Sequence, residues 1–521
     1  MNTSEGTFLP RSGGRALLAV VTVPIVVLLV HGALYWRYTI DDSFILYRYA
    51  ENFAAGSGLV YNPGEYVEGY TSFLWVLVLG VLAKLGAPVL LASKVLGLTS
   101  AAIVVVFSAA LGIAIGGRLR GLLTGLLLAG SGVFVINAVE GLETQFFAAL
   151  VWASIVLHLR ESDSSSRVPV SVLLALLATL TRPDGILLLP ALLGLRVVAL
   201  CKHRDGRTAD AVWLKTAVAL CLLTLGAYSL WRWSYYGDLL PNTYFAKPGG
   251  SASLFARGVS RVAEFVTATG GPLVWGIALL SLIRRSRRRI FLLPLIWLCT
   301  RLFLTLWSGG AWMGTHRFMA PALPALILMY VSGVETALQF VANRTGVGRR
   351  SPVLKEVGAI FAVAVLFAVY VGRSTSLHSG ALDYTHRLER AHVAVGQWLR
   401  AAAPVGSTLA CEDTGALPYY SRLVTVDILG LSNRYIAHLP GGFYEKSDPG
   451  YVLGRSPDLV VLLGRTSPPA PFVGREAVET AIATHPQFHR RYALAAWTTF
   501  ADSYNLWVFR KRDLRLLNVP Q

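Results

Sequence analysis

Long apolar runs dominate this sequence and restrict the folds open to it. The runs recur from Ala16 to about Gly372, separated by short polar or basic stretches, whereas the residues after Arg373 have the mixed composition of a globular domain. Only 15% of the 521 residues are charged, compared with about 25% in a typical soluble domain. The sequence therefore predicts a polytopic α-helical membrane protein over residues 1–372, followed by a soluble α/β domain over residues 373–521.

The number of membrane-spanning helices is expected to be about twelve, because a span needs roughly 20 apolar residues and fewer where it is kinked. One of the runs between residues 70 and 137 must be short, re-entrant or broken, since the basic loops otherwise leave one crossing too many. No small-residue cleavage site precedes Tyr35, so we expect a retained first helix and not a signal peptide. The expected spans are residues 16–36, 70–86, 89–115, 121–137, 143–159, 168–181, 185–200, 211–232, 271–283, 290–307, 318–341 and 353–372.

Arginine clusters set the expected orientation. The chain carries 47 Lys and Arg against 29 Asp and Glu, and much of the excess lies in short clusters such as residues 284–289. Clusters of this kind mark cytoplasmic loops, so we attribute the charge to orientation in the lipid bilayer and expect no nucleic-acid partner. Counting from residues 284–289 places these segments outside the cytoplasmic membrane: 140–144, 182–185, 233–270, 307–317 and everything after Arg373. With Arg11 and Arg15 inside, the segment 37–69 is also expected outside.

The first outer segment, residues 37–69, holds the densest group of polar residues. Asp41 and Asp42 directly follow the first helix, and Arg48 comes about two helical turns later. Two adjacent carboxylates could supply a general base, with Arg48 as a counter-charge, or hold a divalent cation. The alternative is that the two aspartates only cap a short interfacial helix over residues 43–54.

Other outer segments also carry polar residues that could bind a substrate. Glu140 and Glu143 share a helical face if helix continues between them, although one of them is explained by the dipole of the helix that follows. Cations on the outer side run against the usual distribution, which favours an anionic ligand such as phosphate. Aromatic belts at the membrane surface would explain several of the tyrosines and tryptophans equally well. The further candidate binding residues are Glu68, Tyr70, Arg182, Asp184, Tyr236, Asn242, Thr243, Lys247, His316 and Arg317.

The tail is expected to form a small α/β domain. An amphipathic helix over about 384–402 precedes apolar strands at 408–413, 423–431 and 458–463. Asp413 and Asp427 end or follow strands and could touch a substrate, although surface turns are the commoner fate of such residues. The four cysteines predict no disulfide. The chain has no P-loop, HExxH or CxxC motif, and no GxSxG in a strand-turn-helix context, which argues against ATP-driven transport, zinc hydrolysis and thiol chemistry.

In their order along the chain, these motifs resemble those of the GT-C class of membrane glycosyltransferases, in particular the mycobacterial terminal β-1,2-arabinofuranosyltransferase family. The motifs lie between Asp41 and His438 and are Asp-Asp…Arg, Asn-Pro-Gly-Glu-x-Val-Glu-Gly-Tyr-Thr-Ser, Gly-Leu-Glu-Thr, Arg-Pro-Asp-Gly, Tyr-Tyr-Gly-x-Leu-x-Pro-x-Thr-x-x-Ala-Lys, His-Arg-Phe and Val-Asp-x-Leu-Gly-Leu. The resemblance implies transfer of a sugar, arabinofuranose, from a polyprenyl-phosphate donor. The acceptor would be a cell-envelope polysaccharide or lipoglycan on the outer face of the cytoplasmic membrane.

The resemblance also implies roles for individual residues. Asp41 matches the acidic residue that such enzymes use as catalytic base in the first outer loop, with Asp42 beside it, and Glu143 matches a later acidic position of related lipid-sugar transferases. The lipid phosphate would be held by Lys247, with Arg317 or Arg182. No cofactor is required, and a divalent cation at Asp41 and Asp42 is the alternative way to neutralise the phosphate.

Two other classes of function remain open from the sequence. A transporter or flippase for lipid-linked sugars would also place charges at membrane depth, but internal repeats typical of transporters are not evident. A non-catalytic envelope-assembly protein would account for the tail, but it leaves Asp41, Asp42 and the outer cations without a purpose.

Overall fold

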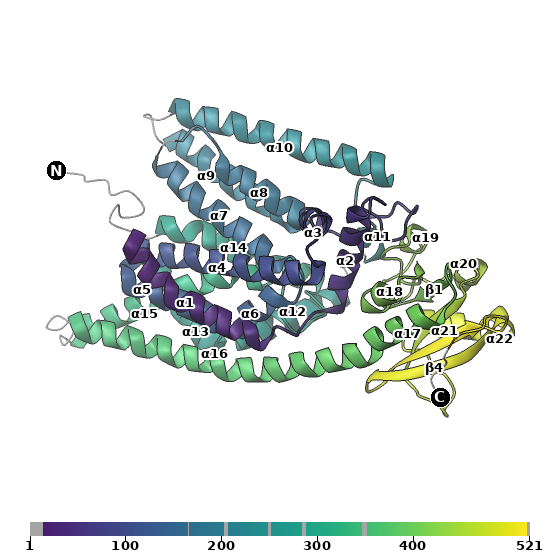
Figure 1. Ribbon diagram of the computed structural model, residues 1–521. Helices are drawn as coiled ribbons and strands as arrows, with labels where there is room; N and C mark the ends of the chain where they lie inside the picture. The colour runs from purple at the N-terminus through teal and green to yellow at the C-terminus, as the bar shows by residue number, and fades with distance from the viewer. Residues whose placement is uncertain are drawn as a thin grey trace. The chain divides into compact units, whose positions relative to one another are not determined.

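The computed structural model describes residues 14–164, 166–202, 207–247, 252–283, 288–345 and 352–517. Within these ranges, apolar stretches form helices up to the tail, and the strands lie in the tail (Figure 1). The helices before the tail are α1 (Gly14–Leu34), α2 (Asp41–Ala54), α3 (Phe73–Lys84), α4 (Val89–Gly116), α5 (Arg118–Gly130), α6 (Gly132–Val139), α7 (Thr144–Asp163), α8 (Val170–Thr181), the 3-10 turn η1 (Pro183–Leu187), α9 (Leu188–Lys202), α10 (Arg207–Tyr236), α11 (Asn242–Ala246), α12 (Ala252–Ala268), α13 (Gly271–Leu279), the 3-10 turn η2 (Leu280–Ile283), α14 (Arg288–Ser308), the 3-10 turn η4 (Ala320–Ala322), α15 (Leu323–Thr345) and α16 (Pro352–Leu388).

Each expected span coincides with helix, but fewer helices have the length and composition to cross a membrane. Among the described residues six helical stretches do, or up to eight if each of two bent helix pairs is one span. One bent pair is α5 and α6, which meet at 62°, and the 12-residue α3 is shorter than a span. Both lie in the region where a short or broken helix was expected. The six stretches are Val89–Gly116, Pro183–Cys201, Thr208–Tyr236, Ile290–Ser308, Ala320–Arg344 and Lys355–Ala402.

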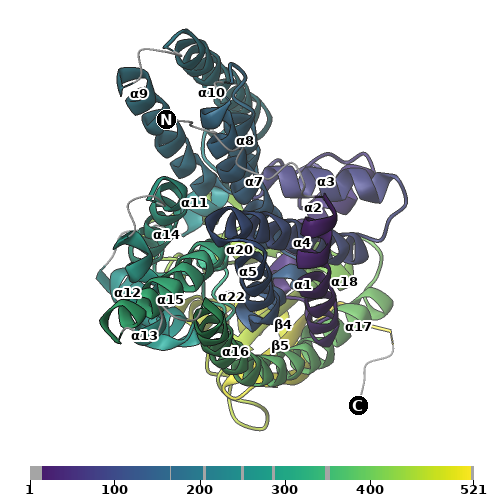
Figure 2. The same cartoon turned by 90° about the vertical axis from the view of Figure 1, so that its left-hand side faces the viewer.

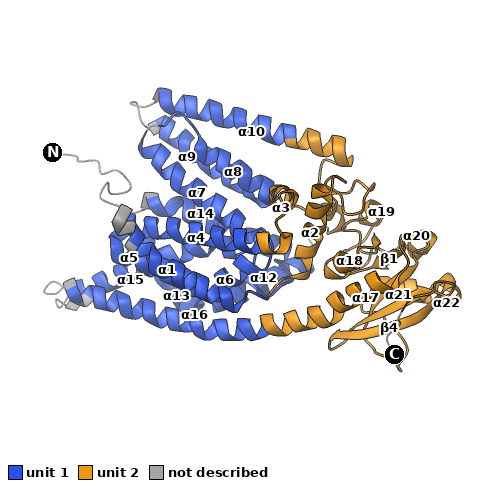
Figure 3. Ribbon diagram, viewed as in Figure 1, with its two compact units in different colours: residues 1–37, 93–227, 249–380 blue, residues 38–92, 228–248, 381–521 orange. Residues whose placement is uncertain are grey.

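The chain divides into two compact units (Figure 3). Unit 1 comprises residues 1–37, 93–227 and 249–380, and unit 2 comprises residues 38–92, 228–248 and 381–521. This division differs from the expected boundary at residue 372, because two segments from the first half of the chain pack with the tail. The last expected span ends at residue 372, but α16 extends past that residue. It continues through a π-helical turn at Glu389–Val393 into α17 (Ala394–Ala402).

Unit 1 is a bundle in which α1 packs on α5, α7 on α8 and α13 on α15 (Figures 1 and 2). Small residues bring α1 and α5 together. A Cβ atom added to Gly125 would lie 2.8 Å from Cγ of Pro24, and one on Gly121 would lie 3.2 Å from Val20. Glycines four residues apart allow this close approach of helix backbones, which is how helices commonly associate in lipid.

Unit 2 is built on a five-stranded sheet of order β2-β1-β3-β5-β4. Strands β1 (Thr408–Cys411), β2 (Val424–Asp427) and β3 (Leu459–Gly464) are parallel and coincide with the expected strands, whereas β4 (Tyr492–Ala501) and β5 (Tyr504–Lys511) form an antiparallel hairpin. All of β3 is buried, because apolar cores cover both faces of the sheet. The helices of the tail are α17, α18 (Ala416–Ser421), α19 (Arg434–Ala437), α20 (Pro449–Gly454), α21 (Ala477–Thr484) and α22 (Pro486–Arg491).

Candidate active site

Asp41 opens α2, but its carboxylate does not cap that helix. The N-cap residue is Ile40, which makes no side-chain cap. Oδ1 of Asp41 instead accepts a hydrogen bond from the backbone N–H of Ala416 at 2.7 Å. Gly415 makes room for the carboxylate, since a Cβ atom at that position would lie 2.1 Å from Oδ2 of Asp41. The tail of the chain therefore positions the Asp41 carboxylate, and the helix-cap alternative does not describe it.

A hydrogen-bonded group of tail residues surrounds Asp41 in unit 2. Asp413 Oδ2 lies 2.6 Å from His392 Nε2 and also accepts a hydrogen bond from the Tyr504 hydroxyl. Burial acts to raise the pKa of Asp413, but the hydrogen bond and charge of His392, together with the Tyr504 hydroxyl, lower it below its ordinary value. Asp413 is therefore the ionised partner of His392, and it places a negative charge near Asp41.

The pKa of Asp41 moves in the opposite direction. Burial raises the pKa of this carboxyl to about 7; the charge of His392 opposes the rise, and the charges of Asp413 and Asp42 add to it. A carboxylate with a pKa near neutrality is a stronger base than an ordinary aspartate, and it is still deprotonated in much of the population at pH 7. Asp41 thus has the electrostatic properties of a general base.

Asp42 is the second residue of α2, and its side chain is half-buried. In the part of the chain that the structure describes, no three His, Cys, Asp or Glu side chains are arranged to hold a metal ion.

Arg48 is not the counter-charge of Asp41. Its buried guanidinium donates to the carbonyl oxygens of Tyr61 at 2.8 Å, Pro418 at 3.0 Å and Leu423 at 2.7 Å, and to Oδ1 of Asn62 at 3.0 Å. The donors of the fork are used within the protein. The structure gives Arg48 the role of joining the first outer segment to the tail, in place of the predicted contact with Asp41 or substrate.

Glu68, Tyr70 and Tyr236 are also buried in unit 2. Glu68 Oε2 lies 2.8 Å from Nε of Arg232, and burial raises the pKa of the Glu68 carboxyl to about 7 against the effect of that arginine. The hydroxyls of Tyr70 and Tyr236 are 2.9 Å apart, and Tyr236 donates to the Leu59 carbonyl at 2.8 Å. These contacts fix the loops around the site.

The segment that contains Asn242 and Lys247 contacts the loop after β2. The Asn242 side-chain amide donates to the carbonyls of Gly430 and Leu431 at 2.7 and 2.9 Å. Within the described residues, Oδ1 of Asn242 and Oγ1 of Thr243 are buried without a hydrogen-bond partner. Lys247 is exposed, and its Nζ lies 4.8 Å from the centre of the Phe443 ring.

The loop after β2 is itself held by Asp427. This buried carboxylate accepts from the backbone N–H groups of Leu429, Gly430 and Ser432 at 2.8, 2.9 and 2.6 Å. Its role is to shape the turn, so of the two tail aspartates only Asp413 belongs to the surroundings of Asp41.

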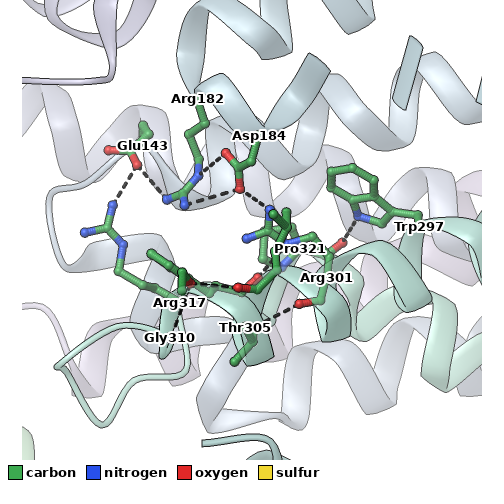
Figure 4. A network of polar contacts seen from close by, with 12 residues as sticks. Glu143, Arg182, Asp184, Trp297, Arg301, Thr305, Gly310, Arg317 and Pro321 are labelled. Atoms are coloured by element: carbon green, nitrogen blue, oxygen red, sulfur yellow. Dashed lines mark hydrogen bonds and ion pairs between the residues drawn. The ribbon is translucent and has the colours of Figure 1, made fainter. Parts of the chain in front are cut away.

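A second polar cluster lies in unit 1 and brings together four of the predicted residues (Figure 4). Glu143 Oε1 accepts from Arg182 Nη1 at 2.9 Å and from Arg317 Nη2 at 2.7 Å. Asp184 accepts from Arg182 Nε at 3.1 Å and from Arg301. Glu143 was predicted as a catalytic residue, but one of its oxygens binds two guanidiniums, so its place in the structure is that of an arginine-positioning residue.

This arginine cluster has more positive charge and more donors than its own carboxylates use. Three guanidiniums, those of Arg182, Arg301 and Arg317, face the carboxylates of Glu143 and Asp184. Among the described residues, Nη2 of Arg301 and Nε of Arg317 are buried and make no hydrogen bond. Buried donors without acceptors are costly, so the cluster is suited to an anionic ligand with several oxygens, such as a phosphate.

Glu140 and His316 lie beside this cluster. Glu140 is fully buried and accepts from Thr144 at 3.0 Å and Thr315 at 3.4 Å. Burial raises the pKa of the Glu140 carboxyl to about 7, against the charge of Arg317. The ring of His316 packs edge-on against Phe265, and burial lowers its pKa. A histidine in its neutral form adds no charge to a phosphate site, unlike the predicted cation.

Comparisons with known proteins agree with this architecture. A family model described as "Domain of unknown function (DUF8728)" matches residues 381–513. The terminal β-(1→2)-arabinofuranosyltransferase of Mycobacterium tuberculosis is 29% identical over 305 residues, covering 54% of this chain and 47% of that protein, so the chain spans about half the length of this curated relative.

Solved structures share the fold over most of the chain. ArnT from Cupriavidus metallidurans, bound to undecaprenyl phosphate, has a TM-score of 0.59 at 16% identity and covers 97% of this chain and 99% of its own. The Archaeoglobus fulgidus oligosaccharyltransferase in its apo form has a TM-score of 0.52 at 11% identity, over 87% of this chain and 70% of its own. The chain has the GT-C fold. The GT-C resemblance inferred from the motifs is thus confirmed, together with the helical membrane architecture.

Because the guanidinium of Arg48 is bonded within the protein, we expect substitution of Arg48 to lower the stability of the fold. Replacing it by lysine (Arg48→Lys) keeps the charge but leaves several buried carbonyl oxygens without donors, which costs about 3 kcal/mol. We expect a clearly lower midpoint of thermal unfolding in detergent. Arg490→Lys, at an exposed arginine of α22, is the matched control and should leave the midpoint unchanged. An unchanged midpoint for Arg48→Lys would contradict this structural role, and Arg48 would again be a candidate substrate ligand.

Proposed function

We propose that the protein is an inverting membrane glycosyltransferase that moves a sugar, arabinofuranose, from a polyprenyl-phosphate donor to a cell-envelope glycan. The observation that carries the proposal is the Asp41 carboxylate, placed by Ala416 and Gly415 and given a raised pKa by its surroundings. A non-catalytic assembly protein has no use for such a group. The arabinose specificity rests on the 29% identity to the mycobacterial enzyme, and it is the finer part of the proposal.

The proposed transfer needs a base for the acceptor hydroxyl and positive charge for the departing phosphate. In unit 2, Asp41 takes the proton of the acceptor hydroxyl as its oxygen bonds to the anomeric carbon of the donor. The bond from that carbon to the phosphate oxygen breaks, and polyprenyl phosphate leaves with the electron pair. The guanidiniums of Arg182, Arg301 and Arg317, a cluster within unit 1, are the candidate ligands of a polyprenyl phosphate. No nucleotide takes part, and no cofactor is required.

The base role of Asp41 is tested by Asp41→Asn, which preserves the shape of the side chain and its acceptor for Ala416. Transfer should fall at least about 100-fold while donor binding is retained. In the wild type the rate should drop as pH falls below about 7, because a base whose pKa is raised to that value becomes protonated there. Kinetics between pH 5 and 9 measure both effects. Near wild-type turnover of Asp41→Asn would place the base elsewhere, with Asp42 next to examine.

Gly415→Ala provides an independent check on the position of Asp41. The added methyl group collides with the carboxylate, so transfer should fall while Asp41 itself is still present. Gly454→Ala is the matched control, because a Cβ atom there meets nothing within 4 Å. Equal activity of the two variants would contradict the positioning of Asp41 by the tail.

The phosphate role predicts a loss of donor affinity and not of acceptor affinity. Arg317→Gln removes a charge and an unpartnered donor, and donor affinity should fall about tenfold or more. Lys247→Ala tests the other predicted phosphate ligand, and Arg387→Gln, in an exposed pair with Asp383, is the control. Activity that survives EDTA would support phosphate binding by cationic side chains alone, whereas complete loss on chelation would point to a divalent cation. Unchanged donor affinity in both Arg317→Gln and Lys247→Ala would contradict this assignment.

Orientation is the remaining part of the proposal: the active site and residues 373–521 outside the cytoplasmic membrane. Cys201 is exposed, whereas Cys411 is buried and a poor probe of accessibility. We therefore expect a membrane-impermeant maleimide to label Arg490→Cys on intact cells, and Cys201 only after the inner face is opened. The reverse pattern would overturn the orientation.

A further inference from the structure

Unit 2 contains a cleft that the transfer chemistry does not use. Its volume is about 610 Å³, and it lies between the outer edge of β2, the helices α19 and α20, and the loop at residues 65–67. Three tyrosines, two arginines and a glutamate contribute to its walls: Tyr66, Tyr435, Tyr451, Arg434, Arg455 and Glu65. All of these residues belong to unit 2.

One wall is a fixed aromatic platform. The rings of Tyr435 and Tyr451 are stacked, with centres 4.2 Å apart and planes at 26°. Asp448 holds both residues, since it accepts from the Tyr435 hydroxyl at 2.7 Å and from the Tyr451 backbone N–H at 2.8 Å. Tyr451 packs against the core of the sheet, whereas Tyr435 is 47% exposed. Because the ring of Tyr435 is already held in place, binding a ligand on it loses little side-chain entropy.

The two arginines of the cleft are each paired with a carboxylate, Arg455 with Glu65 in the lining and Arg434 with Asp238 beside it. Arg455 Nη2 lies 2.6 Å from Oε1 of Glu65, and the guanidinium of Arg434 contacts both oxygens of Asp238 at 3.0 Å. The cleft is thus close to neutral, which does not suit a nucleic acid or a polyphosphate. A guanidinium beside a carboxylate still presents hydrogen-bond donors and acceptors side by side. Neighbouring hydroxyl groups of a ligand can bond to both.

The edge of the sheet in the cleft is closed to an added peptide strand. The backbone N–H of Thr425 in β2 donates to Oδ1 of Asn62 at 3.1 Å, and its carbonyl accepts from Nδ2 of Asn62 at 2.8 Å. Asn62 thus occupies the groups that β-strand addition needs. Polar and charged side chains also interrupt the lining, so it lacks the continuous apolar surface that a lipid chain requires.

We propose that this cleft binds a neutral oligosaccharide, the glycan acceptor, through stacking on Tyr435 and hydrogen bonds to Arg455 and Glu65. Sugar rings present apolar C–H faces to aromatic side chains and hydroxyl groups to planar polar ones, and the cleft supplies both. The inference rests on the proposed glycosyltransferase function and deepens it, because it assigns the acceptor a binding site beyond the reacting hydroxyl.

The test uses the full-length protein in detergent with a neutral arabinan oligosaccharide of about five residues as probe. Tyr435→Ala and Arg455→Ala should each weaken probe binding, and raise the acceptor KM, by about tenfold. The kcat at saturating acceptor should be unchanged, as should the slow hydrolysis of the donor. Trp497→Ala and Arg490→Ala, at exposed positions outside the cleft, are the matched controls.

The outcomes separate this inference from the proposed function. If the wild type transfers sugar but the cleft variants keep wild-type binding and KM, the cleft is not the acceptor site and the enzyme assignment stands. If the wild type forms no glycoside yet binds the probe, and Tyr435→Ala abolishes binding, the cleft binds glycan and the enzyme assignment fails. Tighter binding of an anionic oligosaccharide or of a peptide than of the neutral probe would overturn the proposed ligand class.

Discussion

The buried guanidinium of Arg48 is the interaction on which unit 2 depends. It donates hydrogen bonds to carbonyl oxygens of the first outer segment and of the tail. Segments about 370 residues apart in the sequence are thus held together by one charged group. A buried charge is tolerated only when its donors are satisfied, and this requirement fixes how α2 meets α18. Asp41 lies at the start of α2 and Ala416 at the start of α18, so the placement of the carboxylate follows from the same contact.

The apolar pattern was sufficient to predict the helices that coincide with the expected spans and three of the strands, because burial in lipid or in a sheet core leaves a direct mark on composition. It did not predict α12 or the tail helices α18 to α22. It could not fix the number of crossings, since α3 is apolar and yet has only 12 residues in unit 2. The hairpin of β4 and β5 was not foreseen. Asp41 could be marked as a candidate from its position, but the Asp413, His392 and Tyr504 group near it could not, because these residues lie more than 350 positions away with no local motif.

The arginine cluster shows a different limit. The sequence marked Glu143, Arg182, Asp184 and Arg317 as separate candidates in separate loops, and the structure joins them. Arg301 was missed, although a signal existed: it is an arginine inside the apolar run of α14, and ionisable residues at such positions usually serve a site. The contacts of Glu143 and Arg48 with residues far away in the sequence give both a positioning role in place of the predicted chemical one. The spacing of residues along the chain contains no information on such contacts.

The discontinuity of unit 2 has a consequence for how the protein is made. The hydrogen bond between Asp41 and Ala416 joins residues 375 positions apart. At about 5–20 residues per second, synthesis of the intervening chain takes on the order of tens of seconds. Throughout that interval α2, with its apolar face and its unpaired Arg48, has been synthesised but has no tail to fold against. The region that matches the family model, residues 381–513, likewise lacks its partners when it is produced alone. During biosynthesis the exposed apolar face of α2 must therefore be kept from aggregating until the last quarter of the chain has been made.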